Sequence, residues 1–316
     1  MASIKTLVKD IEHVLLNGAI VEDDKVDRFG KLVADTMYRR INEAKREFTL
    51  RLSNIGHPCV RKLWLDKHRP EGKEPLRAPT KFKFLFGDLI ELLVLFLADL
   101  AGHDVKDEQK ERMLYGIKGH SDATIDGELV DAKSASSFSF NKFQAGLTAE
   151  GDSFGYLGQL GGYHKSAQDD PSVVNKEQAH FLVVDKQHGK LALDTHNFDH
   201  DNIDWEGSVQ ARIALVDAPD IPERAFGPVE DGYTKSDTKQ FIPNGNLKLG
   251  VQCSYCDQKR NCYEDIRVFL SSRGPQFFTK VVKTPKMKEL TWEEYINASE
   301  EVPEVSSGVL SEAEAK

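Results

Sequence analysis

The chain contains 316 residues, of which 40% are hydrophobic, so it can bury the core of one large domain or of two smaller ones. Its most apolar stretch, residues 82–100, is interrupted by three acidic side chains, and the N-terminus lacks the order of a signal peptide. We therefore expect a cytoplasmic protein without a membrane span. The formal net charge of −9 argues against a broadly basic, nucleic-acid-coating protein, although glutamates after Trp292 contribute much of it.

Helical periodicity dominates the first part of the chain. Residues 3–16 place apolar side chains on one face between Ser3 and Gly18, which favour a helix start and a helix stop. The same periodicity predicts a second helix over residues 24–45. The Pro-, Gly- and charge-rich residues 69–79 predict a connector, and a long buried helix is expected over residues 81–101.

The middle of the chain changes to strand periodicity. Residues 115–125 and 128–134 are short β-type runs on either side of Asp126-Gly127, a dipeptide that favours a two-residue type I′ turn. These runs predict a hairpin. Further patterns predict helices over residues 139–147, 153–168 and 202–216 and a second hairpin over residues 180–184 and 190–195, whereas residues 299–316 hold few large apolar side chains and predict little order.

Two aspartates and a lysine are expected to converge on the first hairpin. A two-residue turn places Asp122 opposite Asp131, and Lys133 shares the strand face of Asp131 because side chains two apart point the same way. Carboxylates suit Mg²⁺ or Mn²⁺, and a neighbouring lysine can orient or deprotonate water and stabilise charge on a phosphate. Taken alone, Asp-x-Lys is explained better by a surface hairpin with scattered charge.

The four cysteines form a second constellation. Cys253, Cys256 and Cys262 are spaced as Cys-x2-Cys-x5-Cys, and Cys59 lies far upstream. Without a signal peptide the thiols are expected to stay reduced and to be available as ligands. Four thiolates suit either a structural Zn²⁺ or a 4Fe-4S cluster, and the number of ligands does not separate the two.

Several motifs occur in the order typical of one enzyme family. Gly119-His120-Ser121-Asp122 is followed by Asp131-Ala132-Lys133 and then by a helix that carries Tyr156, Gln159 and Tyr163 on one face. The sequence thereby resembles the PD-(D/E)XK nucleases of the RecB type. The resemblance implies an α/β fold with a mixed central sheet flanked by helices, Asp122 and Asp131 as ligands of Mg²⁺ or Mn²⁺, and Gln159, Tyr163 and Tyr156 as contacts to nucleic acid.

The chain departs from this family's pattern at one position. The family usually carries Gly-x-x-x-His, with the histidine as a further metal ligand, where this chain has Gly87 and Glu91. We expect Glu91 to replace the histidine, since a carboxylate is an equally good ligand for a hard cation; Asp88 is the alternative. Gly161-Gly162 inside the motif helix predict a close approach of its backbone to DNA or to the neighbouring sheet.

The surroundings of the cysteines extend the resemblance. HPCVRKLWL around Cys59 and CSYCDQKRNC at the C-terminal trio are similar to the iron–sulfur members of the same nuclease group, including CRISPR-associated exonucleases. This likeness implies a 4Fe-4S cluster on Cys59, Cys253, Cys256 and Cys262, with zinc as the alternative. Arg61 and Lys62 are then expected to compensate the charge of the cluster or to contact DNA.

These patterns together predict four segments: a helical N-terminal region with the first cluster ligand (1–75), a nuclease core (76–240), an iron–sulfur segment (241–283) and an acidic, flexible tail (284–316). The resemblance implies a metal-dependent exonuclease acting on DNA, with single-stranded ends as the expected substrate, in recombination, repair or phage DNA metabolism in bacterial or phage-infected cytoplasm. Recombination or helicase proteins are possible partners. An endonuclease, an inactive iron–sulfur DNA-binding protein and a zinc-stapled binding module are the alternatives.

Overall fold

The protein is described here by a computed structural model that covers residues 3–42, 47–272 and 274–297. The chain is mixed α/β and forms two compact units. The first comprises Met1–Glu71 and Lys81–Ala225, and the second comprises Gly72–Thr80 and the chain from Phe226 onward. No helix in the described part is long and apolar enough to cross a membrane. The α/β class predicted from the sequence is confirmed.

The helices of the first unit follow the periodicity of the sequence. Ser3 caps the first turn by accepting a hydrogen bond from Lys5 N, and Gly18 ends α1 with φ 79°. The second predicted helix ends at Ile41, and residues 43–45 of that prediction lie outside the described residues. The helical elements are η1 (Ile4–Thr6), α1 (Leu7–Asn17), α2 (Asp23–Ile41), α3 (Leu52–Ile55), α4 (Val60–His68), η2 (Pro70–Gly72), α5 (Ala78–Leu100), α6 (Ser137–Gln144), α7 (Tyr156–Ser166), η3 (His200–Asn202) and α8 (Trp205–Asp217).

A five-stranded mixed sheet lies at the centre of the first unit. Its order is β1-β4-β5-β6-β7; β5 and β6 are parallel, and the other neighbours are antiparallel. A separate two-stranded sheet pairs β2 with β3. The strands are β1 (Val105–Lys106), β2 (Lys110–Leu114), β3 (Ile117–Ser121), β4 (Ala123–Ile125), β5 (Glu128–Ala135), β6 (Gln178–Asp185) and β7 (Leu191–Asn197). The predicted β-type run 115–125 is therefore split at Asp122 between two sheets.

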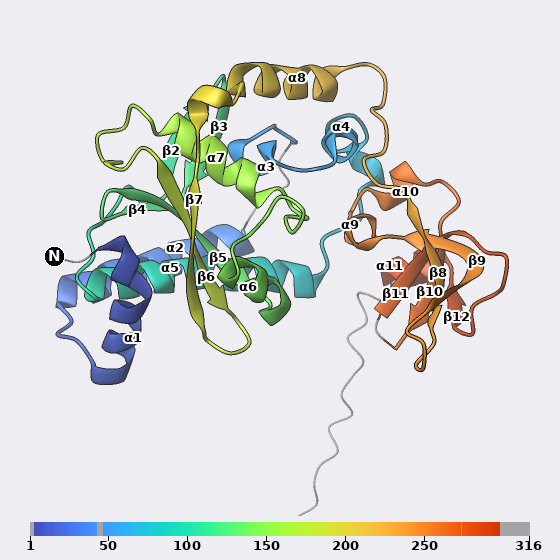
Figure 1. Cartoon of the computed structure of the whole chain (residues 1–316), viewed down its shortest axis with the longest axis horizontal. Helices are drawn as coiled ribbons and strands as arrows, with labels where there is room; N and C mark the ends of the chain where they lie inside the picture. Colours follow the sequence, from blue (N-terminus) through green and yellow to red (C-terminus); the bar gives the residue numbers. More distant parts are fainter. Residues whose placement is uncertain (1–2, 43–46, 273, 298–316) are drawn as a thin grey trace, which may run out of the picture. The chain divides into compact units, whose positions relative to one another are not determined.

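Helices cover both faces of the central sheet (Figure 1). On one face α1 and α5 pack against alternate residues of β4 to β6, including Ile125, Val130 and Leu182. On the other face α6 and α7 pack against the intervening positions, including Leu129 and Phe181. Because strand side chains alternate between faces, β5 contributes to both cores.

The turn between β4 and β5 has the predicted geometry. Asp126 and Gly127 both have positive φ, 52° and 79°, as a type I′ turn requires. Thr124 pairs with Leu129 and Ala123 pairs with Val130, which is the register that a two-residue turn demands. The hairpin prediction is confirmed.

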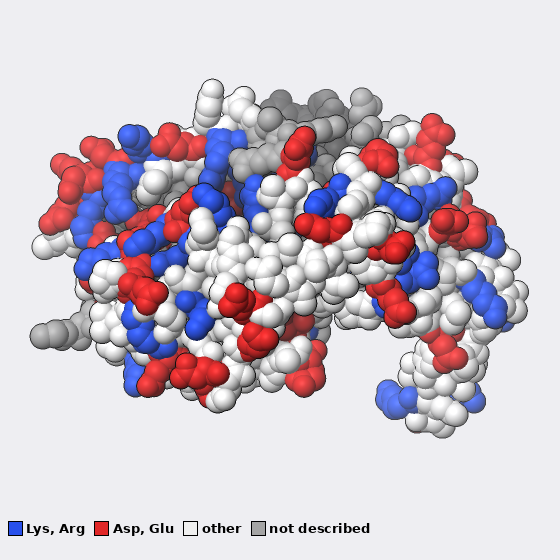
Figure 2. Space-filling model, turned by 90° about the horizontal axis from the view of Figure 1, so that it is seen from above, with Lys and Arg blue, Asp and Glu red and all other residues white. Residues whose placement is uncertain are grey.

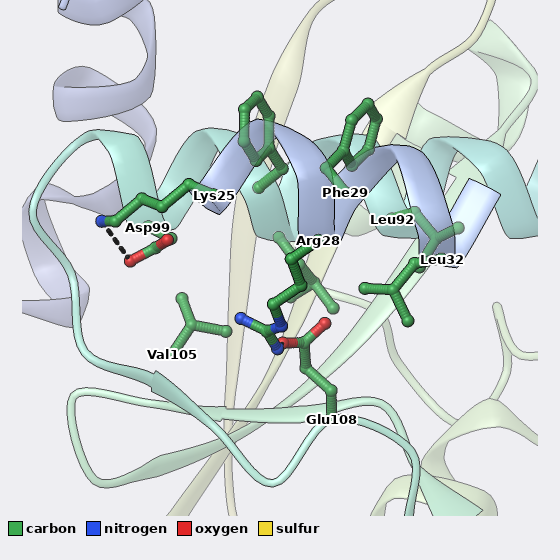
Figure 3. Close-up of a pocket in the computed structure, with 10 residues that line it drawn as sticks. Lys25, Arg28, Phe29, Leu32, Leu92, Asp99, Val105 and Glu108 are labelled. Atoms are coloured by element: carbon green, nitrogen blue, oxygen red, sulfur yellow. Dashed lines mark hydrogen bonds and ion pairs between the residues drawn. The ribbon is translucent and has the colours of Figure 1, made fainter. Parts of the chain in front are cut away.

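Helices α2 and α5 pack through a stacked pair of rings, Phe29 and Phe96, whose centroids are 4.5 Å apart. Figure 3 shows the gap beside this contact, where Lys25 Nζ pairs with Asp99 at 3.0 Å. Its volume of about 30 Å³ has room for only one or two water molecules. It is a packing gap and not a ligand pocket.

The second unit is built on an antiparallel sheet that the sequence analysis did not predict. Its strand order is β12-β10-β11-β9-β8, and its core includes Tyr263, Phe277 and Tyr295. Residues 284–297, assigned to a flexible tail, contain β12 and α11; residues 298–316 lie outside the described part. The elements are β8 (Pro228–Thr234), β9 (Phe241–Leu249), α9 (Val251–Ser254), α10 (Lys259–Cys262), β10 (Arg267–Ser271), β11 (Gly274–Lys280), β12 (Lys288–Leu290) and α11 (Trp292–Asn297).

Candidate active site

Asp131 and Lys133 project from the same face of β5 and form an ion pair. Asp131 is buried, with 2% of its surface exposed, so its charge requires partners. Gln159 of α7 supplies one by donating from Nε2 to Asp131 Oδ1 at 3.2 Å. The parallel pairing of β5 with β6 places this strand in the middle of the sheet. The carboxylate is thus held by groups from two elements.

Asp122 reaches the same place from the junction of β3 and β4. The ladder of the hairpin ends at Ala123 and Val130, so Asp122 is not paired with Asp131 in the register extrapolated from the turn. Its side chain instead accepts a hydrogen bond from Ala132 N on Oδ2 at 2.8 Å. The extrapolated pairing is wrong because the chain leaves the central sheet at Asp122 to enter β3, but the two carboxylates remain neighbours.

A third carboxylate comes from α5. Gln109 Nε2 donates to Glu91 Oε1 at 2.6 Å and lies 3.5 Å from Asp122 Oδ1, so one amide links the two acids. Asp88, the alternative to Glu91, is held by Arg40 of α2 at 2.5 and 2.8 Å. Gln109 was not found from the sequence: it lies in the irregular turn between β1 and β2, with φ 53°, and no motif marks it.

Two of the three acids have raised pKa values, and burial is the largest cause for each. The pKa of Glu91 is raised to about 7: burial is the largest cause, the hydrogen bond from Gln109 opposes it, and the charges of Asp131 and Asp88 add to it. Burial followed by the charges of Asp131 and Glu91 holds the pKa of Asp122 well above its ordinary value. Burial disfavours the ammonium of Lys133, but the adjacent carboxylates dominate and raise its pKa. A positive charge added beside these carboxylates would therefore stabilise their ionised forms.

The donor chemistry fits a hard divalent cation. Glu91, Asp122 and Asp131 supply only oxygen ligands, which Mg²⁺ and Mn²⁺ prefer. The N–H groups of Gln109, placed between two of these acids, provide the partial positive charge that a cation would supply in full. Within residues 3–42, 47–272 and 274–297, no three His, Cys, Asp or Glu side chains are close enough to hold a metal as they stand.

Helix α7 presents its motif residues in different ways. Tyr156 lies beside the charged group, and its ring centroid is 5.3 Å from Lys133 Nζ. Tyr163 is 2% exposed, and its hydroxyl hydrogen-bonds the backbone of His120. A Cβ on Gly119 would lie only 2.9 Å from the Tyr163 ring, so this glycine permits the contact. Tyr163 therefore anchors β3, which leads into Asp122, and does not reach the surface.

The glycines of α7 allow close packing with protein groups. A Cβ on Gly161 would lie 2.9 Å from both Phe198 and Trp205. At the start of the helix, a Cβ on Gly155 would collide with the carbonyl oxygen of Gly56 at 1.9 Å. The predicted close approach is thus made by aromatic side chains and by the segment after α3, and it fixes α7 and with it Gln159.

Three of the four cysteines lie in one short segment of the second unit. Cys253 is in α9, Cys256 is in the following turn, and Cys262 ends α10; all three are partly buried. Backbone hydrogen bonds of 3.2 Å from Cys256 N to Cys253 O and 3.0 Å from Cys262 N to Gln258 O shape the turn. Cys59 belongs to the first unit, where it caps α4. A site shared by all four remains a prediction.

The predicted DNA-contacting cations near Cys59 are engaged within the first unit. Arg61 Nη1 donates to Pro222 O at 2.7 Å, and Lys62 pairs with Asp66. On the face seen in Figure 2, acidic and basic side chains are interspersed and do not gather into one basic surface.

Comparisons with known proteins add nothing to this geometry. No family model, curated protein or solved structure matches the chain.

Proposed function

We propose that this protein is a metal-dependent DNA exonuclease. The observation that carries the proposal is the convergence of Glu91, Asp122 and Asp131 from three separate elements around Lys133. A group of repelling carboxylates, with Asp131 buried and the other two partly buried, is costly for folding unless it serves a cation. Its order along the chain matches the motif order of the PD-(D/E)XK nucleases, and this resemblance supplies the substrate and the reaction.

Each residue has a distinct role in phosphodiester hydrolysis. Glu91, Asp122 and Asp131 would hold one or two Mg²⁺ or Mn²⁺ ions, which activate water and neutralise charge on the phosphate. Lys133, an ammonium beside Asp131, can donate hydrogen bonds to a phosphate oxygen and stabilise the charge that develops on it. Gln159 fixes the orientation of Asp131 through its 3.2 Å hydrogen bond.

The cysteines support a second part of the proposal. We expect Cys253, Cys256 and Cys262, with Cys59, to bind a 4Fe-4S cluster that stabilises the fold and takes no part in hydrolysis. The trio is presented by one compact turn beside the core of the second unit, where Cys253 and Cys262 pack against buried side chains. Zinc is the alternative metal for the same thiolates.

The deciding experiment follows end-labelled linear single-stranded DNA beside a circular form of the same sequence, with Mg²⁺ or Mn²⁺. Wild type is compared with Asp131→Ala and Lys133→Ala, and with Asp217→Asn, an exposed acid paired with Lys67, as the matched control. We expect loss of the linear form only, abolished by chelator and by both site substitutions but not by the control. Cleavage of circles would indicate an endonuclease, and no cleavage with either metal would leave a DNA-binding protein.

A further inference from the structure

Phe154 is a large apolar side chain that the fold leaves exposed, and its ring contacts that of Tyr156, the tyrosine beside Lys133. It lies in the turn before α7, and 52% of its surface is accessible. The turn is held by Asp152, whose Oδ1 accepts hydrogen bonds from Phe154 N at 3.2 Å and Gly155 N at 2.8 Å and whose Oδ2 accepts one from Leu157 N at 2.8 Å. The ring is thus presented by an ordered backbone, which lowers the entropy cost of using it for binding.

The position of the ring connects it to the acids. Its centroid is 5.6 Å from that of Tyr156 at an interplanar angle of 40°, and the Tyr156 ring is 5.3 Å from Lys133 Nζ. The two separations keep Phe154 within about 11 Å of the ammonium. At about 3.4 Å or more per nucleotide, that distance spans one to three nucleotides of a strand whose phosphate lies at Lys133.

An exposed aromatic ring at this distance from a phosphate-binding lysine suits one class of ligand. Nucleobases stack on aromatic side chains irrespective of sequence, but only where they are unpaired and not already stacked in a duplex. Tyr156 links Phe154 to the core, because its ring also packs edge-on against the buried Phe181, with centroids 6.5 Å apart. About half of the Phe154 surface is accessible to a base.

We propose that Phe154, backed by Tyr156, forms a nucleobase-binding subsite that stacks on an unpaired base next to the nucleotide held at Asp131 and Lys133. This inference rests on the proposed nuclease function and adds the reason for a single-stranded substrate: a base in a duplex cannot reach the ring. Phe154 acts as a positioning residue, because it contacts a base and not the reacting phosphate.

The binding test uses the full chain carrying Asp131→Asn, so that the DNA stays intact in Mg²⁺. Single-stranded oligonucleotides carry the fluorescent base 2-aminopurine at successive positions from the end. We expect stacking to quench one position, or two adjacent ones, and the quench to disappear when Phe154→Ala is added. Phe154→Trp should retain it. Tyr38→Ala, which removes an aromatic ring of 74% exposure on α2, should leave it unchanged.

The kinetic test uses an abasic nucleotide at the quenched position. Loss of one stacked base is expected to raise KM about five- to tenfold with kcat within about twofold, whether the base or the Phe154 ring is removed. Removing the base and the Phe154 ring together should raise KM no more than removing either one alone. An abasic penalty of full size in Phe154→Ala, or an unchanged quench, would overturn the subsite. Cleavage without a Phe154-dependent quench contradicts the subsite alone, whereas a Phe154-dependent quench without cleavage by wild type contradicts the nuclease and leaves the subsite standing.

Discussion

The side-chain amide of Gln109 lies 2.6 Å from the Glu91 carboxylate and 3.5 Å from that of Asp122. One neutral donor thus links two acids whose charges repel each other and whose pKa values are raised chiefly by burial. This relationship identifies a place in the molecule where an added cation would stabilise the fold. It also makes the effect of removing the amide predictable.

Gln109→Ala should lower the melting temperature in the absence of metal. The lost hydrogen bond leaves two neighbouring acids without a shared donor, at a cost of about 1 kcal/mol, or roughly 2 °C for a chain of this size. Added Mg²⁺ or Mn²⁺ should recover most of this difference. Melting curves of wild type and variant over a metal titration measure it. Equal metal stabilisation of Asp131→Ala, which lacks a proposed ligand, would contradict the site.

Gln159→Ala should reduce DNA cleavage by about 10- to 100-fold while leaving the fold intact, because Asp131 loses the donor that orients it. Gln168→Ala is the matched control, since Gln168 follows the C-terminal end of α7 and donates to the backbone carbonyls of His164 and Lys176. Initial rates and far-UV circular dichroism are compared for both variants. A rate for Gln159→Ala equal to that of the control would remove Gln159 from the machinery.

The purified protein should be brown and carry about four iron and four sulfide per chain. Cys256→Ala should lose the colour and most of the iron and should melt at a lower temperature, because cluster binding contributes to folding. Ser254→Ala, at a neighbouring position in α9, should keep the colour, the iron and the melting temperature of the wild type. A colourless protein with one equivalent of zinc would show that the thiolates hold zinc instead.

Acid should destabilise the protein through a pair of histidines, of which His164 is fully buried. Trp205 Nε1 can only donate, so it donates to His200 Nδ1 at 2.9 Å, and His200 Nε2 then donates to His164 Nδ1 at 2.9 Å. This chain requires both rings to be neutral. Burial first, and the neighbouring His200 second, lower the pKa of His164 to about 4.

The sign of the pH effect follows from that shift. The unfolded chain binds a proton at His164 near pH 6.5, and the folded protein does so only near pH 4, so stability falls as the pH drops between these values. The loss is at most about 3 kcal/mol. Urea unfolding at pH 7, 6 and 5 should show a shallower fall for His164→Asn than for wild type. His13→Asn, an exposed substitution on α1, should follow the wild type; equal slopes for all three proteins would contradict the assignment.

Two glycines in helices should respond oppositely to alanine. Gly161→Ala places a Cβ 2.9 Å from Phe198 and Trp205 and should destabilise the protein by about 1–2 kcal/mol. Gly30→Ala, in α2, meets no atom within 4 Å and should stabilise it by about 0.5–1 kcal/mol through helix propensity. Chemical denaturation measures both. A stabilising Gly161→Ala would show that the ring contacts of α7 are loose.

Local sequence patterns predicted the helices, strands and turns that depend on residues close together in the chain. Asp126-Gly127 predicted the turn, and the turn fixed the pairing of Ala123 with Val130. Amphipathic periodicity predicted α1, the long apolar stretch predicted α5, and strand patterns predicted the hairpin of β6 and β7. The extrapolation failed one residue beyond the ladder, at Asp122, because whether a strand continues into another sheet depends on contacts made far along the chain.

The antiparallel sheet of the second unit was missed for a related reason. Its strands carry irregular alternation, and β9 and β11 meet with a shift in register, so no simple period marks them. The spacing of the cysteines predicted an iron–sulfur segment over residues 241–283, whereas β9 to β11 occupy most of that range. Pairing between strands separated by loops is not encoded in local periodicity.

The sequence by itself determined the α/β class, the hairpin and the spacing of Asp131, Lys133, Gln159 and the cysteines, because turn preference, strand alternation and helical periodicity act over short distances. Only the tertiary structure decided that Gln109 joins Glu91 to Asp122, that Arg40 holds Asp88, and that Phe154 stands exposed beside Tyr156. Those relationships join α5, the turn after β1 and the turn before α7, and their geometry is set by how the packed layers bury their apolar faces.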